Sequence, residues 1–218
     1  LPDKGRAKLA VRDGKIELYS AASDIGQGCA TVFVQMVSET TGLGKEMVRN
    51  MGANSEVAPD SGTTSGSRQT LITGEAVRMA AADLNEALQE AGGDLSQLEG
   101  REFFAEFFDP TDKLGADVPN PKSHVAYGFA THVVVLDDDG VLMGLGYALT
   151  EDFPLKNGVP QAKYGTLGLM RSTQIPDIHA IYVEKEELLS FAYGAKGIGE
   201  IATIPTAPAA QGAYYAKD

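Results

Sequence analysis

An acidic residue follows a glycine-rich stretch near the end of the sequence, AYGAKGIGEIATIP at residues 192–205. Gly194, Gly197 and Gly199 lie within six residues, and Glu200 comes directly after them. Glycines this dense cost backbone entropy and packing, so they indicate that another group approaches the main chain closely. Glu200 would then be a candidate acid or base beside that group. A loop with a solvated glutamate is the simpler interpretation of this stretch alone.

A second stretch, DSGTTSGSRQT at residues 60–70, has the composition of an anion site. Five hydroxyl side chains and two glycines lie between Ser61 and Ser67, just ahead of an expected helix. Free N–H groups and the helix dipole favour an anion at such a position, so this loop is a candidate phosphate site. A Ser/Thr-rich N-cap is the alternative, although a cap needs only one hydroxyl.

A third turn, DIGQGCA at residues 24–30, places glycines on both sides of Gln27. The Gln27 amide can both donate and accept hydrogen bonds, as recognition of a heterocycle or an oxo group requires. A plain turn from strand to helix explains this stretch as well. The sequence has no GxxxxGK[ST] motif, so a P-loop is not expected.

Composition narrows the class of protein. The chain has 218 residues, 43% of them hydrophobic, and a formal net charge of −12. This charge disfavours a nucleic-acid or anionic-membrane surface, because no basic excess is available to neutralise phosphates. Cys29 is the single cysteine, so an internal disulfide is excluded, and without CxxC or HExxH spacing no iron–sulfur, zinc or haem site is expected. The expected location is the reducing cytoplasm, with neither a signal peptide nor a membrane span.

The elements that must position the three turns can be predicted from hydrophobic periodicity. Alternating apolar residues at 9–11 and 16–18 predict a tight hairpin, and the stretch 28–44 predicts a helix that stops at its glycines. A short strand is expected within residues 48–54. A long amphipathic helix is expected over 77–88, ending near Gly92 and Gly93.

The second half of the chain is expected to begin again with strands, within residues 124–140, followed by a helix over 141–154. Residues 94–122 are polar and proline-bearing and are interpreted as a connector. The expected fold class is therefore α+β, a two-lobed structure with mixed β-sheets and packed helices. It would form one partial domain over 1–218, with possible lobes 1–93 and 123–218 joined by the connector 94–122.

Together and in this order, the three turns resemble the molybdopterin-binding domain at the C-terminal end of the large subunit of molybdenum hydroxylases, the xanthine dehydrogenase and aldehyde oxidase family. IGQG is similar to the family's turn that touches the pterin. DSGTTSGSRQT is similar to the loop that binds the pterin and phosphate end, and GAKGIGE to the motif that carries the active-site glutamate. The stretch at 146–178 further resembles the bacterial xanthine dehydrogenase branch, which includes selenium-dependent purine or nicotinate hydroxylases.

The resemblance implies a set of cofactor contacts and a reaction. The implied cofactor-binding residues are Gly26, Gln27, Gly28, Thr63, Thr64, Ser65, Gly66, Ser67, Arg68, Gln69, Ala195, Lys196, Gly197, Ile198 and Gly199. The implied cofactor is molybdopterin with molybdenum, expected in the cytosine dinucleotide form, whose dithiolene holds the metal without protein ligands. Hydroxide on the molybdenum would attack an electron-poor carbon of an aromatic N-heterocycle (purine-like or nicotinate-like) or of an aldehyde. Glu200 would act as general base.

The resemblance also implies partners. FAD and [2Fe-2S] centres are expected on other domains or subunits, together with the remaining part of the large subunit. Between Gly140 and Val141 the sequence lacks a longer segment found in the family, and the preceding half of a typical large subunit is absent, so the chain resembles a fragment.

The alternative from another class is a non-catalytic nucleotide- or phosphate-binding scaffold. Such a scaffold has no use for Glu200, whereas a hydroxylase requires it. If the resemblance holds, Gln27, the loop at 61–70 and Glu200 converge in space.

Overall fold

The chain divides into two compact units. Unit 1 contains Leu1–Tyr127 and Glu186–Gly197, and unit 2 contains Gly128–Lys185 and Ile198–Asp218. The computed structural model describes residues 3–52, 54–65, 67–113, 115–122, 128–135, 153–163, 165–169, 171, 173, 178–184, 191–199 and 201–217. No helix within these ranges is long and apolar enough to cross a membrane. Most residues of the three turns belong to unit 1.

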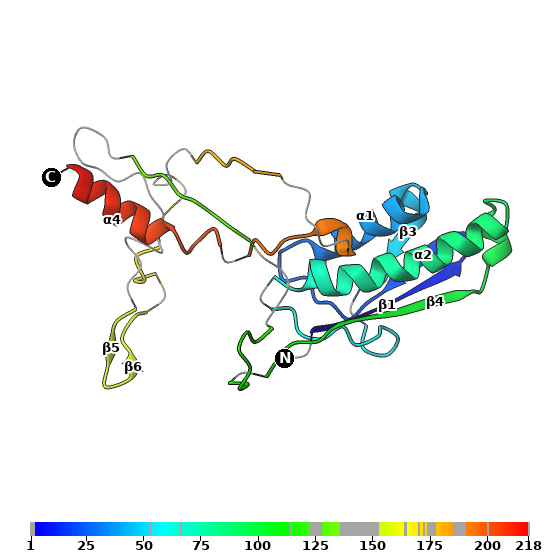
Figure 1. Cartoon of the computed structure of the whole chain (residues 1–218), viewed down its shortest axis with the longest axis horizontal. Helices are drawn as coiled ribbons and strands as arrows, with labels where there is room; N and C mark the ends of the chain where they lie inside the picture. Colours follow the sequence, from blue (N-terminus) through cyan, green and yellow to red (C-terminus); the bar gives the residue numbers. More distant parts are fainter. Residues whose placement is uncertain are drawn as a thin grey trace. The chain divides into compact units, whose positions relative to one another are not determined.

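Unit 1 is built on a four-stranded sheet with the strand order β3-β2-β1-β4 (Figure 1). Its strands are β1 (Asp3–Arg12), β2 (Lys15–Tyr19), β3 (Val48–Asn50) and β4 (Glu102–Asp109). β1 pairs antiparallel with β2 and β4, whereas β2 pairs parallel with β3. The predicted hairpin is confirmed, because Asp13 and Gly14 turn the chain with φ of 52° and 66°, the backbone that a two-residue hairpin loop requires.

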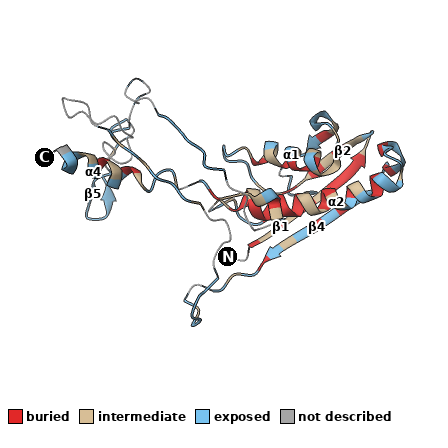
Figure 2. Cartoon of the chain, turned by 45° about the horizontal axis from the view of Figure 1, so that its top comes forward, coloured by how far each residue is buried: buried red, intermediate tan, exposed pale blue. Residues whose placement is uncertain are grey.

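Two helices pack on one face of this sheet and enclose the core (Figure 2). They are α1 (Cys29–Thr41) and α2 (Gly74–Glu90), and both confirm helices predicted from periodicity. The buried side chains of Leu9 and Val11 on β1 meet Phe33 of α1 and Leu84 of α2 in one cluster. Each such side chain contributes about 1.5–3 kcal/mol on burial, which fixes both helices on the sheet.

Shorter helical turns connect these elements. They are η1 (Lys45–Met47), the π-helical turn η2 (Gln69–Thr73), η3 (Leu95–Leu98) and η5 (Phe191–Gly194). η2 runs directly into α2 and passes very close to β1. A Cβ atom on Gly5 would lie 2.7 Å from the carbonyl oxygen of Ile72, so only glycine allows this approach. The start of α2, and the loop before it, are thereby held against the sheet.

Part of the region interpreted as a connector is a strand. Residues 102–109 form β4, the edge strand beside β1, and do not merely join two lobes. Phe103 and Ala105 point into the core, whereas Phe104 and Phe108 are about half exposed on the other face. Phenylalanine therefore occurs on both faces, which hides the period-two alternation that would have indicated a strand.

Over its described residues, unit 2 contains a short hairpin and the helix α4 (Thr206–Lys217). The hairpin joins β5 (Leu155–Lys156) to β6 (Val159–Pro160). The strands predicted within 124–140 do not form over the described residues 128–135. The helix predicted over 141–154 lies outside the described residues except for its last two.

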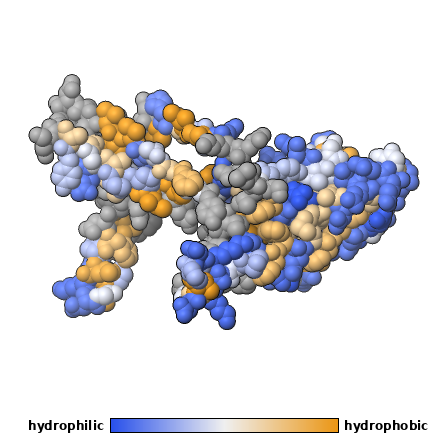
Figure 3. All heavy atoms as spheres, viewed as in Figure 1, coloured by the Kyte–Doolittle hydropathy of each residue, from blue (hydrophilic) through white to orange (hydrophobic). Residues whose placement is uncertain are grey.

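The missing strand has a physical explanation. Phe129, Val133 and Val135 are 94%, 86% and 73% exposed, so among the described residues of unit 2 no layer covers these alternating side chains. Hydrophobic atoms accordingly appear on the surface of unit 2 in Figure 3. An alternating sequence becomes a strand only when a neighbouring strand pairs with it and one of its faces is covered.

Candidate functional site

The turn at 24–30 and the loop at 60–70 lie side by side in unit 1. The hydroxyl oxygens of Ser20 and Ser61 are 2.8 Å apart, and Ala21 N–H donates to the Pro59 carbonyl over 3.1 Å. The Ser23 carbonyl accepts two hydrogen bonds, from Thr64 Oγ1 at 2.9 Å and from Gln27 Nε2 at 3.1 Å. The predicted convergence is therefore confirmed for these two of the three turns.

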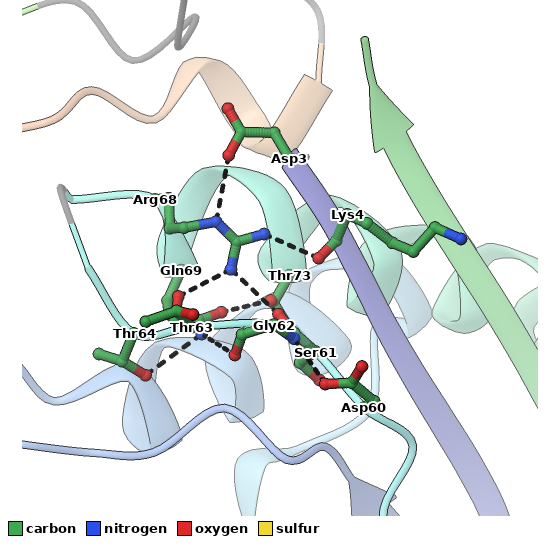
Figure 4. Close-up of polar contacts among 10 residues, drawn as sticks. All are labelled: Asp3, Lys4, Asp60, Ser61, Gly62, Thr63, Thr64, Arg68, Gln69 and Thr73. Atoms are coloured by element: carbon green, nitrogen blue, oxygen red, sulfur yellow. Dashed lines mark hydrogen bonds and ion pairs between the residues drawn. The ribbon is translucent and has the colours of Figure 1, made fainter. Parts of the chain in front are cut away.

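Arg68 fastens the loop from inside the protein (Figure 4). Its side chain is 4% exposed, and Nε lies 3.2 Å from Oδ1 of the fully buried Asp3. Nη1 donates to the carbonyls of Ser61 at 3.0 Å and Thr63 at 2.9 Å, and Nη2 donates to the carbonyl of Lys4 at 2.7 Å. One guanidinium thus joins the first residues of β1 to both ends of the turn. These donors bind groups of the protein itself, so Arg68 stabilises the loop from its buried side.

Three consecutive backbone N–H groups of this loop have no partner among the described residues: those of Thr63, Thr64 and Ser65. Thr63 and Ser65 are exposed. Unpaired N–H groups in sequence are the usual way in which a loop binds an anion without a basic side chain. The hydroxyl of Ser61, in contrast, points inward and donates to the Arg6 carbonyl at 2.8 Å, so it is structural.

Gln69 stabilises the same loop from the π-helical turn. Its side chain is buried, and Nε2 lies 3.2 Å from Thr64 Oγ1 and 3.5 Å from the Gly62 carbonyl. Its Oε1 accepts from the hydroxyl of the buried Thr73. Gln69 therefore orients Thr64, and its amide is satisfied within the protein.

Asp24 is a functional residue that the sequence analysis did not single out. The backbone N–H groups of Gly26, Gly28 and Ala30 donate to its carboxylate at 3.0, 3.2 and 3.4 Å. These bonds, chiefly those from Gly26 and then Gly28, hold the pKa of Asp24 below its ordinary value. Asp24 therefore caps the entry to α1: it binds Gly28 N–H, at the N-cap position, and Ala30 N–H in the first turn of the helix. An acid just ahead of a Gly-rich helix entry is the signal that could have found it.

The side chain of Gln27 closes its own turn. Its Oε1 accepts from Ile25 N–H at 2.7 Å while its Nε2 donates to the Ser23 carbonyl. Gly26 and Gly28 have φ of 109° and 76°, and nothing lies within 4 Å of the position that a Cβ would take on either glycine. The two glycines thus leave open space beside the backbone of this turn.

The third turn begins on unit 1, where η5 packs against η2 and α2. Ala195, Lys196 and Gly197 follow as the last residues of unit 1, and Ile198 and Gly199 belong to unit 2. Glu200 and Gly66 lie outside the described residues. The convergence of Glu200 with Gln27 stays a prediction.

The described residues contain no group of three or more His, Cys, Asp and Glu side chains placed to hold a metal ion. The polar groups exposed at the paired turns include backbone N–H groups and hydroxyls, together with the carboxylates of Asp24 and Asp60, which accept hydrogen bonds from backbone N–H groups of their own turns. Such donors fit a negatively charged organic group better than a bare cation.

Replacing Arg68 tests its role inside the loop. Arg68→Ala removes the cation beside the buried Asp3 and leaves three carbonyls without this donor, so the free energy of unfolding should fall by about 3–5 kcal/mol. Arg68→Lys should recover only part of it, because one ammonium cannot reach the three carbonyls and Asp3 together. Urea unfolding measures both, with Arg49→Ala, at an exposed site of β3, as the matched control. A lysine variant as stable as the wild type would contradict this assignment.

The cap at Asp24 should produce a pH-dependent stability. Since the pKa of Asp24 is lower in the folded chain, its contribution is present above the pKa of the unfolded chain and is lost as pH falls through the folded value. Asp24→Asn should therefore be less stable than the wild type at neutral pH, and the difference should disappear in acid. Urea unfolding at neutral and acid pH checks this, with Asp83→Asn on the exposed side of α2 as control. A difference that persists in acid would count against the cap.

Comparison with known proteins agrees with this geometry. A family model described as the molybdopterin cofactor-binding domain matches residues 2–139. The xanthine dehydrogenase molybdenum-binding subunit of Escherichia coli O157:H7 is 26% identical over 272 residues, covering 96% of this chain and 36% of the relative. The aldehyde oxidoreductase of Megalodesulfovibrio gigas is 34% identical over 96 residues, 42% of this chain and 11% of that protein. Among solved structures, CO dehydrogenase from Oligotropha carboxidovorans matches with a TM-score of 0.72 and 16% identity, over 97% of this chain and 34% of that one.

Two facts follow from these matches. The chain spans only about a third of the length of the E. coli subunit, 36%. The alignment with that subunit extends over 272 residues, more than the 218 of this chain, so the relative has residues within the aligned region that have no counterpart here. The family model covers more than half of the chain and includes the paired turns at 24–30 and 60–70. The chain therefore belongs to the family of molybdopterin cofactor-binding domains of the molybdenum hydroxylases.

Proposed function

We propose that this chain is the molybdopterin-binding part of an enzyme that hydroxylates an aromatic N-heterocycle, purine-like or nicotinate-like, or an aldehyde, with oxygen taken from water. The observation that carries the proposal is the pairing of the turn at 24–30 with the loop at 60–70, in which the N–H groups of Thr63, Thr64 and Ser65 have no partner among the described residues. A chain with a net charge of −12 needs such neutral donors to hold an anionic cofactor.

Each of the two paired turns would bind a different part of the cofactor. The N–H groups of residues 63–65, with the hydroxyls of Thr63 and Ser65, would hold the phosphate end of the cofactor. Gly26 and Gly28 leave space for the pterin to lie against the backbone of the other turn. Asp24 already occupies the N-terminus of α1, so the loop at 63–65 is the better anion site. Arg68 and Gln69 would not touch the cofactor but would fix the conformation of the loop at 63–65.

Glu200 is proposed as the general base of the reaction. When bound, the molybdenum cofactor would supply the redox chemistry, because it can accept the two electrons that leave the substrate carbon. The carboxylate of Glu200 would take the proton released as water supplies the oxygen. Ala195, Lys196 and the glycines at 197 and 199 would let the backbone pass close to the cofactor and hold that carboxylate in place.

The proposal includes several partners. The printed names of the relatives include a xanthine dehydrogenase and an aldehyde oxidoreductase, which is why both substrate classes are kept. We propose the cytosine dinucleotide form of the cofactor, FAD and [2Fe-2S] centres on other domains or subunits, and association with the rest of the large subunit. The extra aligned residues of the E. coli subunit support a shortened segment at Gly140–Val141. A reducing cytoplasm is the proposed location, since Cys29 is a buried free thiol.

A scaffold that binds a nucleotide or phosphate without catalysis remains the second candidate. The free N–H groups at 63–65 would serve a scaffold as well as an enzyme. The two candidates differ at Glu200, which only the enzyme needs. The substitutions below therefore test binding and catalysis separately.

A negative charge placed in the loop should prevent cofactor binding. Ser65→Asp puts a carboxylate beside the free N–H groups, where it would compete with the phosphate, so cofactor content should fall about tenfold or more while the fold stays intact. Molybdenum and pterin content per chain in the complete enzyme measure the loss. Ser55→Asp adds the same charge at an exposed site of unit 1 and should load normally. Equal loading of both variants would refute the anion site.

Replacing the proposed base should stop catalysis without unloading the cofactor. Glu200→Gln keeps size and shape but cannot take a proton, so turnover should fall by about a hundredfold or more. Rapid-reaction reduction of the molybdenum centre by substrate measures the step, with cofactor content determined in parallel. Glu184→Gln, at an exposed site of unit 2, is the control. A fully loaded Glu200→Gln enzyme that is reduced at the wild-type rate would favour the scaffold.

A further inference from the structure

The turn that precedes GAKGIGE has an unusual backbone. Ala192 has φ 47° and ψ 38°, and Tyr193 has φ 54° and ψ 31°. Gly194 follows with φ 71°, so three successive residues are left-handed and two of them are not glycine. Side chains disfavour this region, and such conformations persist only where the surroundings impose them, commonly at functional sites.

Three contacts from three different elements impose this turn. The ring of Phe191 lies 5.3 Å from that of Phe107 on β4, measured between centroids. The hydroxyl of Tyr193 is 2.6 Å from Thr40 Oγ1 on α1. The backbone N–H of Ala192 donates to Oε2 of Glu75, at the start of α2, over 2.5 Å. Only the last of these contacts holds the main chain itself.

Glu75 is a buried acid with an organised environment. It is 4% exposed, and the guanidinium of Arg78 binds both of its oxygens, Nη2 to Oε1 at 2.6 Å and Nε to Oε2 at 2.8 Å. A buried carboxylate is costly unless it is paired and hydrogen-bonded. Arg78 meets that requirement, and Oε2 accepts a second hydrogen bond from a backbone N–H 117 residues further along the chain.

We propose that Glu75 is a positioning residue that holds the glycine-rich motif against the cofactor-binding loop. Glu75 follows directly on η2, which continues from the loop at 60–70, so one carboxylate ties the start of the third turn to the end of the second. Its bond to Ala192 N–H fixes the point from which the chain runs through Gly197 to Glu200. We call the hydrogen bond between Glu75 and Ala192 N–H the tether. The functional part of this inference rests on the proposed function, whereas the tether itself does not.

The tether can be measured without activity. Arg78 donates to both oxygens of Glu75, so in Glu75→Gln the amide NH2 faces an Arg78 donor in either orientation, and the acceptor of Ala192 N–H loses its negative charge. Losing this charge-assisted hydrogen bond should make the Ala192 amide of the full chain exchange about tenfold faster or more, as seen by NMR. The amides of β1 should exchange as in the wild type. Glu86→Gln, at an exposed site of the same helix, should change neither.

The functional consequence needs the complete enzyme. Glu75→Gln should keep its cofactor but lose turnover per bound molybdenum, by about tenfold to a hundredfold for a misplaced catalytic group. The loss should fall on kcat, with KM little changed, because Glu75 is not expected to touch substrate. Glu75→Asp, which keeps the charge, should recover part of the rate. Glu86→Gln should match the wild type.

These outcomes distinguish a specific role of Glu75 at Ala192 from a general effect on the stability of the fold. They also distinguish failure of this proposal from failure of the proposed function. Faster exchange of β1 and Ala192 together would show that Glu75 only stabilises the fold, and would overturn the proposal. An unchanged kcat in a loaded Glu75→Gln enzyme would overturn it as well. A loaded wild-type enzyme that turns over neither substrate class would refute the proposed function, and the exchange of Ala192 would still decide whether Glu75 holds this turn.

Discussion

The buried guanidinium of Arg68 is the interaction on which the candidate site depends. It joins Asp3 and the Lys4 carbonyl, at the start of the sheet, to the carbonyls of Ser61 and Thr63 in the loop. The carbonyls of Ser61 and Thr63 turn inward toward the guanidinium. The backbone N–H groups of residues 63–65 are not bonded to any described residue. Because the cation is buried and paired, its positive charge organises the loop without being available to an anion. The donors at 63–65 are a consequence of this arrangement.

The proposed anion site at 63–65 would let an acidic protein bind an anionic cofactor. The chain carries 30 acidic and 18 basic residues, so a field of basic side chains is not available. Backbone N–H groups have no counterions to release and no long side chain to order, and a rigid loop presents them at little entropic cost. At the neighbouring turn, Asp24 uses the same type of donors to cap α1. The donors of one turn thus bind Asp24, whereas those at 63–65 are proposed to bind the cofactor.

Much of unit 1 could be predicted from sequence, because its signals are local. The turn at Asp13-Gly14, the periodicity of α1 and α2 and the glycine stop of α1 are each contained in one short stretch. β4 could not be predicted, because its phenylalanines lie on both faces. The strands expected near 128–135 failed because a strand needs a partner, which the local sequence does not contain. The inward role of Arg68 and the contact between Glu75 and Ala192 join distant positions, so no single stretch encodes them.

The contact between Glu75 and Ala192 also has a consequence for biosynthesis. A ribosome delivers residues in order, so β1, the loop and α2 emerge well before the segment that bonds to Glu75, which comes 117 residues later. Until then the first two turns can pair, but the third has not been made. The contact between Glu75 and Ala192 can therefore form only after residue 192 has left the ribosome. The paired turns can thus fold first, and a nascent chain would present them before η5 packs against α2.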